Sequence, residues 1–328
     1  MQYKSELNLL DTEIAIKFVK DEFERELAKA LNLTRVSAPL FVEPSTGLND
    51  NLNGVERAVK FDVLTLKKDF EIVQSLAKWK RNALARYGFS VGSGLYTDMN
   101  AIRRDEVLDP IHSVYVDQWD WEKIISREDR TFSYLKKTVK AIYKAIKKTA
   151  NKVGKKYPAL KTELPKDITF ISTRTLEEEY PKLTRKEREN AVAKKYGAVF
   201  LYQIGWDLKD GAPHDGRAAD YDDWKLNGDI LLWNDVIGSA FEISSMGIRV
   251  DEVSLVKQLK KRNEMAKLDN PYCQDVVNGK LPLTIGGGIG QSRLCMFLLK
   301  KAHIGEVQSS IWSEEDIKKY EKQGINLL

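Results

Sequence analysis

A glycine-rich segment, residues 284–293, has residue types that suit a nucleotide or an anion. Gly288 and Gly290 would let the backbone approach a flat or charged ligand closely. An apolar helical pattern follows at once, so free N–H groups and the positive end of a helix dipole would lie beside that ligand. Arg293, in the first turn, has a planar guanidinium that stacks on a base or pairs with a phosphate. The run lacks the spacing of a P-loop, so by itself it fits a structural turn equally well.

A second segment, residues 101–122, predicts an antiparallel hairpin. Arg103 ends one strand, a loop follows, and from Ser113 polar and apolar residues alternate as in a half-buried strand. An arginine at the end of such a hairpin is well placed to clamp a phosphate. The alternative is that Arg103 is simply an exposed strand residue.

Two carboxylates, Asp229 and Glu242, lie within apolar, strand-like runs. A buried carboxylate is costly unless a metal ion or an arginine pairs with it, so the two residues are candidates to hold a cation. A structural ion pair with Arg249 is the competing explanation.

The elements that must position these residues are predicted from periodicity. An amphipathic helix is expected over about 12–31, followed by an extended piece over 34–42 in which Pro39 restricts the strand to an edge or an interface. Because strands and helices do not alternate one to one, we expect an α+β fold with a mainly antiparallel sheet flanked by helices. Further strand-like runs lie at 58–64, 70–73, 113–119, 168–172, 198–204, 229–233 and 240–244.

Composition predicts one folded catalytic domain over residues 1–328. The chain is 42% hydrophobic and 31% charged and shows no internal repeat or linker-like tract, which excludes disordered, collagen-like and disulfide-scaffold classes. No apolar run approaches the ~20 residues that cross a bilayer, and the N-terminus has no signal-peptide core, so we expect a cytoplasmic protein with no membrane partner. Cys273 and Cys295 are too few for a metal cluster and are expected to be buried free thiols.

The charge pattern favours small anions over nucleic acid as ligands. The net charge of +5 is a mild excess, and nine lysines lie between Lys136 and Lys156 on a segment with helical apolar spacing. No aromatic residues interleave on the basic side, so a solvated face of a core helix explains the lysines better than a nucleic-acid surface does.

Taken together, these segments resemble a known family. The first helix with the Pro39 strand, the Arg103-Arg104-Asp105-Glu106 hairpin and the Gly288-Ile289-Gly290-Gln291-Ser292-Arg293 segment look like motifs one, two and three of class II aminoacyl-tRNA synthetases. More closely, the chain resembles the ammonia-dependent asparagine synthetases, which are related to the catalytic cores of aspartyl- and asparaginyl-tRNA synthetases. The segments that carry this resemblance are 50–52, 75–80, 112–122, 220–224, 241–249 and 285–293.

The resemblance implies a class II synthetase-like fold and an aspartate–ammonia ligase. ATP would activate the side-chain carboxylate of L-aspartate as β-aspartyl-AMP with release of pyrophosphate, and ammonia would displace AMP to give L-asparagine. The nucleotide site implied by the motifs has Arg103 at the α-phosphate, Arg293 against the nucleotide, His112, Ser113 and Val114 at the base, and Gly288 and Gly290 beneath it. Mg²⁺ would bridge the phosphates from Glu242, with Asp229 assisting.

The resemblance also implies the residues that bind aspartate: Lys80, Asp222, Ser245 and Arg249. Because the β-carboxylate reacts here, the amino acid would bind turned around, with its α-carboxylate in the Arg249 pocket and its ammonium near Asp222. Asp50 would hold ammonium and remove a proton, while Gln118 orients the nucleophile. Without the resemblance, Asp50 in its turn-forming segment is explained as well by an Asx turn.

Two further features of the sequence bear on the lid of the site and on the source of ammonia. A single residue separates Trp224 from Leu226, where the family usually carries a longer polar insertion, so the lid of the site is in question. Neither cysteine is placed as a glutaminase nucleophile, so ammonia is expected to come from solution. The alternative functions are those of a class II aspartyl- or asparaginyl-tRNA synthetase-like enzyme and of a non-catalytic tRNA-binding paralogue.

The first helix and Pro39 match a segment that packs across a two-fold axis in this fold, which implies a homodimer.

Overall fold

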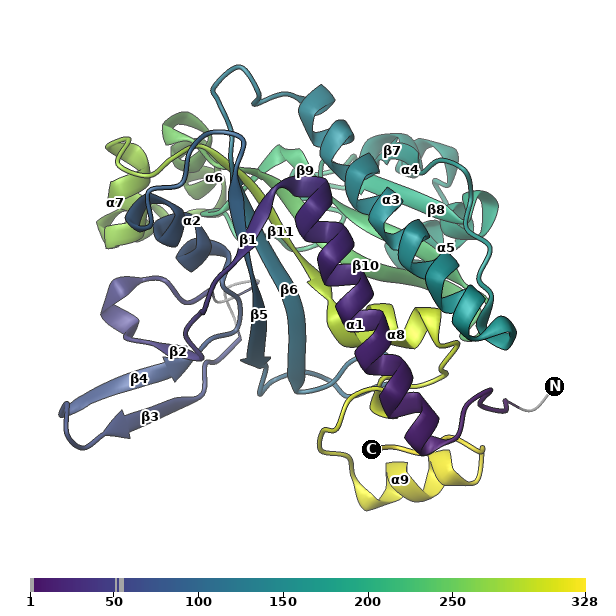
Figure 1. Ribbon diagram of the computed structural model, residues 1–328. Helices are drawn as coiled ribbons and strands as arrows, with labels where there is room; N and C mark the ends of the chain where they lie inside the picture. Colours follow the sequence, from purple (N-terminus) through teal and green to yellow (C-terminus); the bar gives the residue numbers. More distant parts are fainter. Residues whose placement is uncertain (1–2, 51, 53–55) are drawn as a thin grey trace.

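The computed structural model describes residues 3–50, 52 and 56–328, and a broad sheet forms its centre (Figure 1). Within these residues eight strands follow the order β1-β5-β6-β11-β10-β9-β8-β7. Neighbouring strands are antiparallel except for the outermost pairs, β1 with β5 and β7 with β8. The strands are β1 (Leu33–Arg35), β5 (Gly94–Ile102), β6 (Tyr115–Ile124), β7 (Thr169–Ser172), β8 (Ala198–Tyr202), β9 (Asp222–Asn234), β10 (Ser239–Arg249) and β11 (Thr284–Gly290). The predicted α+β architecture is confirmed.

Two long helices, α1 (Leu9–Leu31) and α3 (Phe132–Lys156), pack side by side across one face of this sheet (Figure 1). The helix α1 begins three residues before the predicted start because Asn8 caps it, its side chain accepting the Asp11 N–H at 2.8 Å. The other helices are α2 (Ala77–Arg86), α4 (Thr173–Glu179), α5 (Arg185–Tyr196), α6 (Glu252–Arg262), α7 (Pro271–Val277), α8 (Gln291–Leu298) and α9 (Glu314–Glu321).

The extended piece predicted over 34–42 is not one strand. Its first part is β1 at the edge of the large sheet, and its end is β2 (Phe41–Val42) in a separate sheet with β4 (Lys68–Ile72) and β3 (Lys60–Val63). Pro39 lies in the connection between them, because a residue without an N–H cannot contribute a donor to a ladder. The β3–β4 hairpin projects away from the large sheet (Figure 1).

The glycine-rich segment is a strand rather than the turn that its composition suggested. Residues 284–290 form β11 in the middle of the sheet, between β6 and β10, and α8 follows directly. Glycine is required there by close packing, since a Cβ on Gly286 would collide with Oε2 of Glu122, and one on Gly288 would collide with Oε1 of Gln118. The glycines therefore leave room for polar side chains of the neighbouring strand.

The side chains of strand β6 alternate between an apolar face and a polar face of the sheet. Trp119 and Trp121 are fully buried, and Trp119 packs on Phe23 of α1 with ring centroids 4.8 Å apart. Side chains alternate along a strand, so Asp120 and Glu122 point to the opposite side of the sheet. The apolar face anchors α1, and the polar face is free to build a site.

Three other features of the sequence have a clear structural outcome. Lys148 and Lys152 on α3 pair with Glu26 and Glu22 of α1, which explains part of the lysine-rich face as helix–helix contact. Both cysteines are buried free thiols. The strand β9 runs unbroken through 224–226, so no lid loop emerges there.

None of the helices in the described ranges has the length and apolarity to cross a membrane.

We predict that Gly286→Ala lowers the free energy of unfolding by roughly 1–3 kcal/mol, the usual cost of overpacking, because the new methyl displaces Glu122 and its partner Arg249. Gly290→Ala is the matched control, since its Cβ would lie 3.0 Å from the nearest atom, a side-chain carbon of Arg293. Urea denaturation of both variants makes the comparison. Equal stability of the two would show that the glycine is not needed for packing.

Candidate active site

A cavity of about 420 Å³ lies on the polar face of the sheet. That volume falls in the range of ligand pockets, roughly 300–1,000 Å³. Its walls combine α2, the β5–β6 hairpin, β10, the junction of β11 with α8, and the loop between β8 and β9. The sequence-predicted site residues on its wall are Asp50, Lys80, Arg103, His112, Ser113, Gln118, Asp222, Glu242, Ser245, Arg249, Gly288, Gly290 and Arg293, whereas Val114 and Asp229 are not part of its lining.

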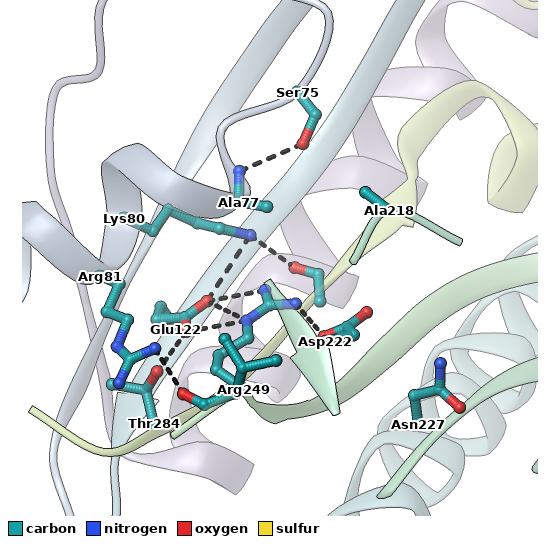
Figure 2. Close-up of polar contacts among 12 residues, drawn as sticks. Ser75, Ala77, Lys80, Arg81, Glu122, Ala218, Asp222, Asn227, Arg249 and Thr284 are labelled. Atoms are coloured by element: carbon teal, nitrogen blue, oxygen red, sulfur yellow. Dashed lines mark hydrogen bonds and ion pairs between the residues drawn. The ribbon is translucent and has the colours of Figure 1, made fainter. Parts of the chain in front are cut away.

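Charged side chains at the cavity form what we term the buried ion-pair network: Lys80, Asp120, Glu122, Asp222 and Arg249, of which all but Glu122 line the cavity. Figure 2 shows Lys80, Glu122, Asp222 and Arg249 pointing toward one another. Arg249 donates from Nε and Nη2 to the Glu122 carboxylate at 2.9 and 2.8 Å, and its Nη1 pairs with Asp222. Lys80 Nζ lies 2.9 Å from Oδ1 of Asp120. No member is more than 3% exposed. The network holds α2, β6, β9 and β10 together from inside.

The network has one negative charge in excess, because three carboxylates face two cations. Burial would raise the pKa of Glu122, yet Arg249, Lys80 and the Thr284 hydroxyl hold that pKa below its usual range. Burial wins for Asp222, whose pKa is raised despite Arg249, and for Lys80, whose pKa is lowered despite Asp120. A ligand that brings an ammonium group together with a carboxylate would complement such a site.

Two arginines from distant parts of the sequence face the same cavity. Arg103 follows β5 at the hairpin, where its N–H donates to the Val114 carbonyl at 2.8 Å. Its buried Nε finds no partner among the described residues, so a donor is left for a ligand. Arg293 lies in the first turn of α8, and its Nη1 donates to the backbone carbonyl of Glu242 at 3.0 Å. Both guanidinium groups suit the phosphates of one nucleotide.

Asp229 and Glu242 lie on adjacent strands and pair with arginines other than Arg249. Nη2 of Arg217 pairs with Oδ2 of Asp229, and Nη1 of Arg293 lies 3.8 Å from Oε2 of Glu242. The proposed structural pair with Arg249 is therefore wrong, because that guanidinium is held by Glu122. Burial and then the neighbouring Glu242, against the pull of Arg217, raise the pKa of Asp229 to about 7.

These two carboxylates fit a hard cation only in part. Oδ1 of Asp229 is buried and has no hydrogen-bond partner within the described chain, which leaves one oxygen open as a ligand. No group of three or more metal-binding side chains occurs in residues 3–50, 52 and 56–328. Magnesium is commonly held by one or two carboxylates plus substrate phosphates, so the pair suits Mg²⁺ that arrives with a nucleotide.

The turn predicted at Asp50 is present, and its catalytic role stays a prediction. Its Oδ1 accepts the Leu52 N–H at 3.0 Å, as in an Asx turn, while Oδ2 is buried without a partner among the described residues. Burial, reinforced by Asp220 and opposed by Lys78, raises the pKa of Asp50 to about 6. A turn that fixes one oxygen thus leaves the other for a ligand. Asn51, from the same motif, lies outside the described residues.

The remaining predicted residues are placed as follows. Gln118 of β6 lies over Gly288, and Ser245 of β10 pairs in register with the same glycine. Nδ1 of His112 lies 2.9 Å from Asp109, and the Ser113 hydroxyl lies 2.6 Å from that of Ser310. The structure brings these side chains to one cavity, and their individual roles stay predictions.

Sequence reasoning missed several charged residues of the site. Asp120 and Glu122 follow Gln118 at two-residue steps, so strand alternation was a signal that placed all three on one face. Lys78 pairs with Asp220 at 2.6 Å, and Arg217 pairs with Asp229, but these partners are far apart in sequence and Arg217 lies in an irregular loop. No local pattern marks such pairs.

Comparison with known proteins identifies the family. The family model described as aspartate–ammonia ligase matches residues 10–324. The aspartate–ammonia ligase of Clostridium tetani is 61% identical over 100% of this chain and 96% of its own length. That of Bacillus cytotoxicus is 58% identical over 99% of both chains. The chain belongs to the aspartate–ammonia ligase family. The expectation of a ligase of this family is confirmed.

Solved structures show the same fold in class II aminoacyl-tRNA synthetases. Asparaginyl-tRNA synthetase from Pyrococcus horikoshii, complexed with asparaginyl-adenylate, matches with a TM-score of 0.67 at 16% identity, over 91% of this chain and 68% of that one. Aspartyl-tRNA synthetase from Entamoeba histolytica matches with a TM-score of 0.59 at 15% identity, over 90% of this chain and 58% of that one. At these identities the likeness concerns the fold, and it confirms the class II synthetase-like core.

Proposed function

We propose that this aspartate–ammonia ligase activates L-aspartate with ATP as β-aspartyl-AMP, releases pyrophosphate, and then lets ammonia displace AMP to form L-asparagine. The observation that carries the proposal is the position of Arg103 and Arg293 on one cavity whose base is the buried ion-pair network. That arrangement offers an anion site for a nucleotide directly beside a site for a zwitterion with two carboxylates.

Aspartate would bind at the base of the cavity with its reacting group toward Arg103. The α-carboxylate would accept hydrogen bonds from the unused N–H groups of Arg249 and from Lys80, while the ammonium would lie near Asp222. The excess negative charge of the network favours the ammonium, and Ser245 on β10 lines the same wall. In this orientation the β-carboxylate, rather than the α-carboxylate, would meet the nucleotide.

In the first step an oxygen of the β-carboxylate would bond to the α-phosphorus of ATP while the bond to the bridging oxygen of pyrophosphate breaks. Arg103 would neutralise the charge that develops on the α-phosphate, and Arg293 would hold the nucleotide. His112, Ser113, Val114 and the glycines Gly288 and Gly290 are the proposed surroundings of the base. Asp229 and Glu242 would hold Mg²⁺ together with phosphate oxygens, and bound there the ion would neutralise phosphate charge.

In the second step the nitrogen of ammonia would attack the activated carbonyl carbon, the bond from carbon to the AMP oxygen would break, and the proton that the attached nitrogen then loses would pass to water. The open oxygen of Asp50 would bind ammonium and accept its proton, so that neutral ammonia attacks, while Gln118 would orient the nitrogen. The burial that raises the pKa of Asp50 also makes its carboxylate a stronger base.

We also propose a homodimer. Leu9, Leu10 and Ile14 on α1 are 53%, 71% and 50% exposed, an unusual apolar surface for the first turns of a core helix. A second copy packed across a two-fold axis would cover it.

The direct test of the function is pyrophosphate release from aspartate and ATP, with and without ammonium and with and without tRNA. We expect ammonium to support sustained turnover with asparagine and AMP as products, and tRNA to have no effect. Turnover that requires tRNA would favour the aminoacyl-tRNA synthetase alternative. Absence of turnover would favour a non-catalytic binding protein.

Arg103→Ala should cost roughly 2–5 kcal/mol of transition-state stabilisation, since one partner of a charge pair with the α-phosphate is removed. The measurement is kcat/KM for pyrophosphate release. Arg104→Ala is the matched control, because the neighbouring arginine is exposed and outside the cavity. Unchanged kcat/KM in the Arg103 variant would remove that residue from the mechanism.

Asp50→Asn should spare adenylate formation and slow amide formation. Because the pKa of Asp50 is raised to about 6, the carboxylate is protonated below that pH, so the ratio of asparagine formation to ATP–pyrophosphate exchange should rise as pH increases through about 6. The variant should lose this rise. Equal loss of both half-reactions would instead assign Asp50 to aspartate binding.

A further inference from the structure

A loop arginine, Arg217, occupies the position beside the carboxylates that are expected to bind metal. It lies in the segment between β8 and β9, on the wall of the cavity. Its Nη2 pairs with Oδ2 of Asp229, and its Nη1 lies 3.0 Å from Oδ2 of Asp215. Glu242 also contributes to the electrostatic stabilisation of its charged form. Arg217 is thus the direct counter-ion of Asp229, while the direct partner of Glu242 is Arg293.

The pairing is incomplete on both sides. Nε of Arg217 is buried without a hydrogen-bond partner among the described residues, and so is Oδ1 of Asp229. The side chains are 11% and 7% exposed, so water compensates little for either group. A buried polar atom without a partner costs about 1–3 kcal/mol. A donor and an acceptor therefore remain for ligands of opposite charge.

The backbone around Arg217 is held in place independently of this ion pair. Nε1 of Trp224 donates to the Ala218 carbonyl at 3.1 Å, and the ring of His214 lies 3.0 Å from Glu189. Arg185 donates to the Pro213 carbonyl at 2.7 Å. The long arginine side chain has several rotatable bonds, so it can change partners without movement of the loop.

We propose that Arg217 is a positioning residue that keeps Asp229 neutralised until Mg²⁺–ATP binds beside Asp229 and Glu242, and then exchanges the Asp229 carboxylate for the terminal phosphates of the nucleotide. This inference rests on the proposed function, because it assumes a nucleoside triphosphate and a divalent cation in this cavity. A divalent ion brings two positive charges to the carboxylate pair and displaces the single charge of Arg217. The freed guanidinium remains in the cavity that Arg103 and Arg293 also line, where phosphate oxygens match its geometry.

A consequence is that metal and nucleotide bind cooperatively. Without a nucleotide, a cation must displace Arg217 from its buried partner Asp229 and leave that guanidinium only the exposed carboxylate of Asp215 as an ion-pair partner. With a nucleotide, the displaced guanidinium gains phosphate oxygens, so each ligand favours the other. The carboxylate pair would therefore bind free divalent cations weakly and the metal–nucleotide complex tightly.

The experiment measures binding of Mn²⁺ alone to the full-length protein without nucleotide, by loss of the free-ion electron paramagnetic resonance signal. Arg217→Met should bind Mn²⁺ about tenfold or more tightly than wild type, within the usual range of coupling between sites. Arg217→Gln, which keeps a donor for Asp229, gives the same comparison if the Met variant does not fold. Lys209→Met is the matched control, since it breaks an exposed ion pair between the same loop and Glu178, away from the carboxylates.

Asp229→Asn, made in wild type and in the Arg217→Met variant, shows whether Mn²⁺ binds at Asp229. It also separates the proposed role of Arg217 from the proposed metal ligands. Loss of the tight Mn²⁺ binding in the Arg217→Met background would support the inference. Equal Mn²⁺ affinity of wild type and both Arg217 variants, lowered by Asp229→Asn in each, would overturn the inference and leave the proposed metal ligands intact. A Mn²⁺ affinity that Asp229→Asn leaves unchanged in every background would overturn both the inference and the assignment of Asp229 as a metal ligand. It would not bear on ammonium-dependent turnover.

Discussion

The structure depends on the contact between the Arg249 guanidinium and the Glu122 carboxylate. The carboxylate is fully buried, and removing one partner of such a pair typically costs about 3–5 kcal/mol, because the other charge is left without compensation. Around this contact, Lys80 from α2 and Asp222 from β9 complete a network that joins elements far apart in sequence. Four members of the network, Lys80, Asp120, Asp222 and Arg249, line the cavity on the polar face of the sheet.

The need to keep these charges paired accounts for the residue types found on neighbouring strands. The strand β11 carries glycines because Gln118 and Glu122 fill the space above them, and β6 places its tryptophans on the other face, against α1. The charge pattern then divides the cavity into two parts. Its base has excess negative charge suited to a zwitterion, while its rim carries arginines suited to phosphates. The proposed activation of aspartate by a nucleotide before amidation would need these two environments side by side.

Local patterns in the sequence were sufficient for some elements and insufficient for others. Apolar spacing predicted α1, and the alternation from Ser113 predicted the hairpin that presents Arg103, because both signals lie within a single element. Glycine content suggested a turn where β11 runs, since the demand for glycine comes from side chains of β6 more than 160 residues earlier. The partner of Asp229 was likewise hidden, because Arg217 reaches it from a loop without periodicity. Pairings between distant segments are set by the assembled sheet.

The most direct test is a crystal structure of the protein with AMP and L-asparagine, the products of the second step. The account predicts that Arg103 contacts the phosphate and Arg293 the nucleotide of a single AMP, while Arg249 contacts the α-carboxylate of asparagine in the same cavity. An AMP bound away from either arginine, or an asparagine whose side-chain amide rather than its α-carboxylate meets Arg249, would contradict it.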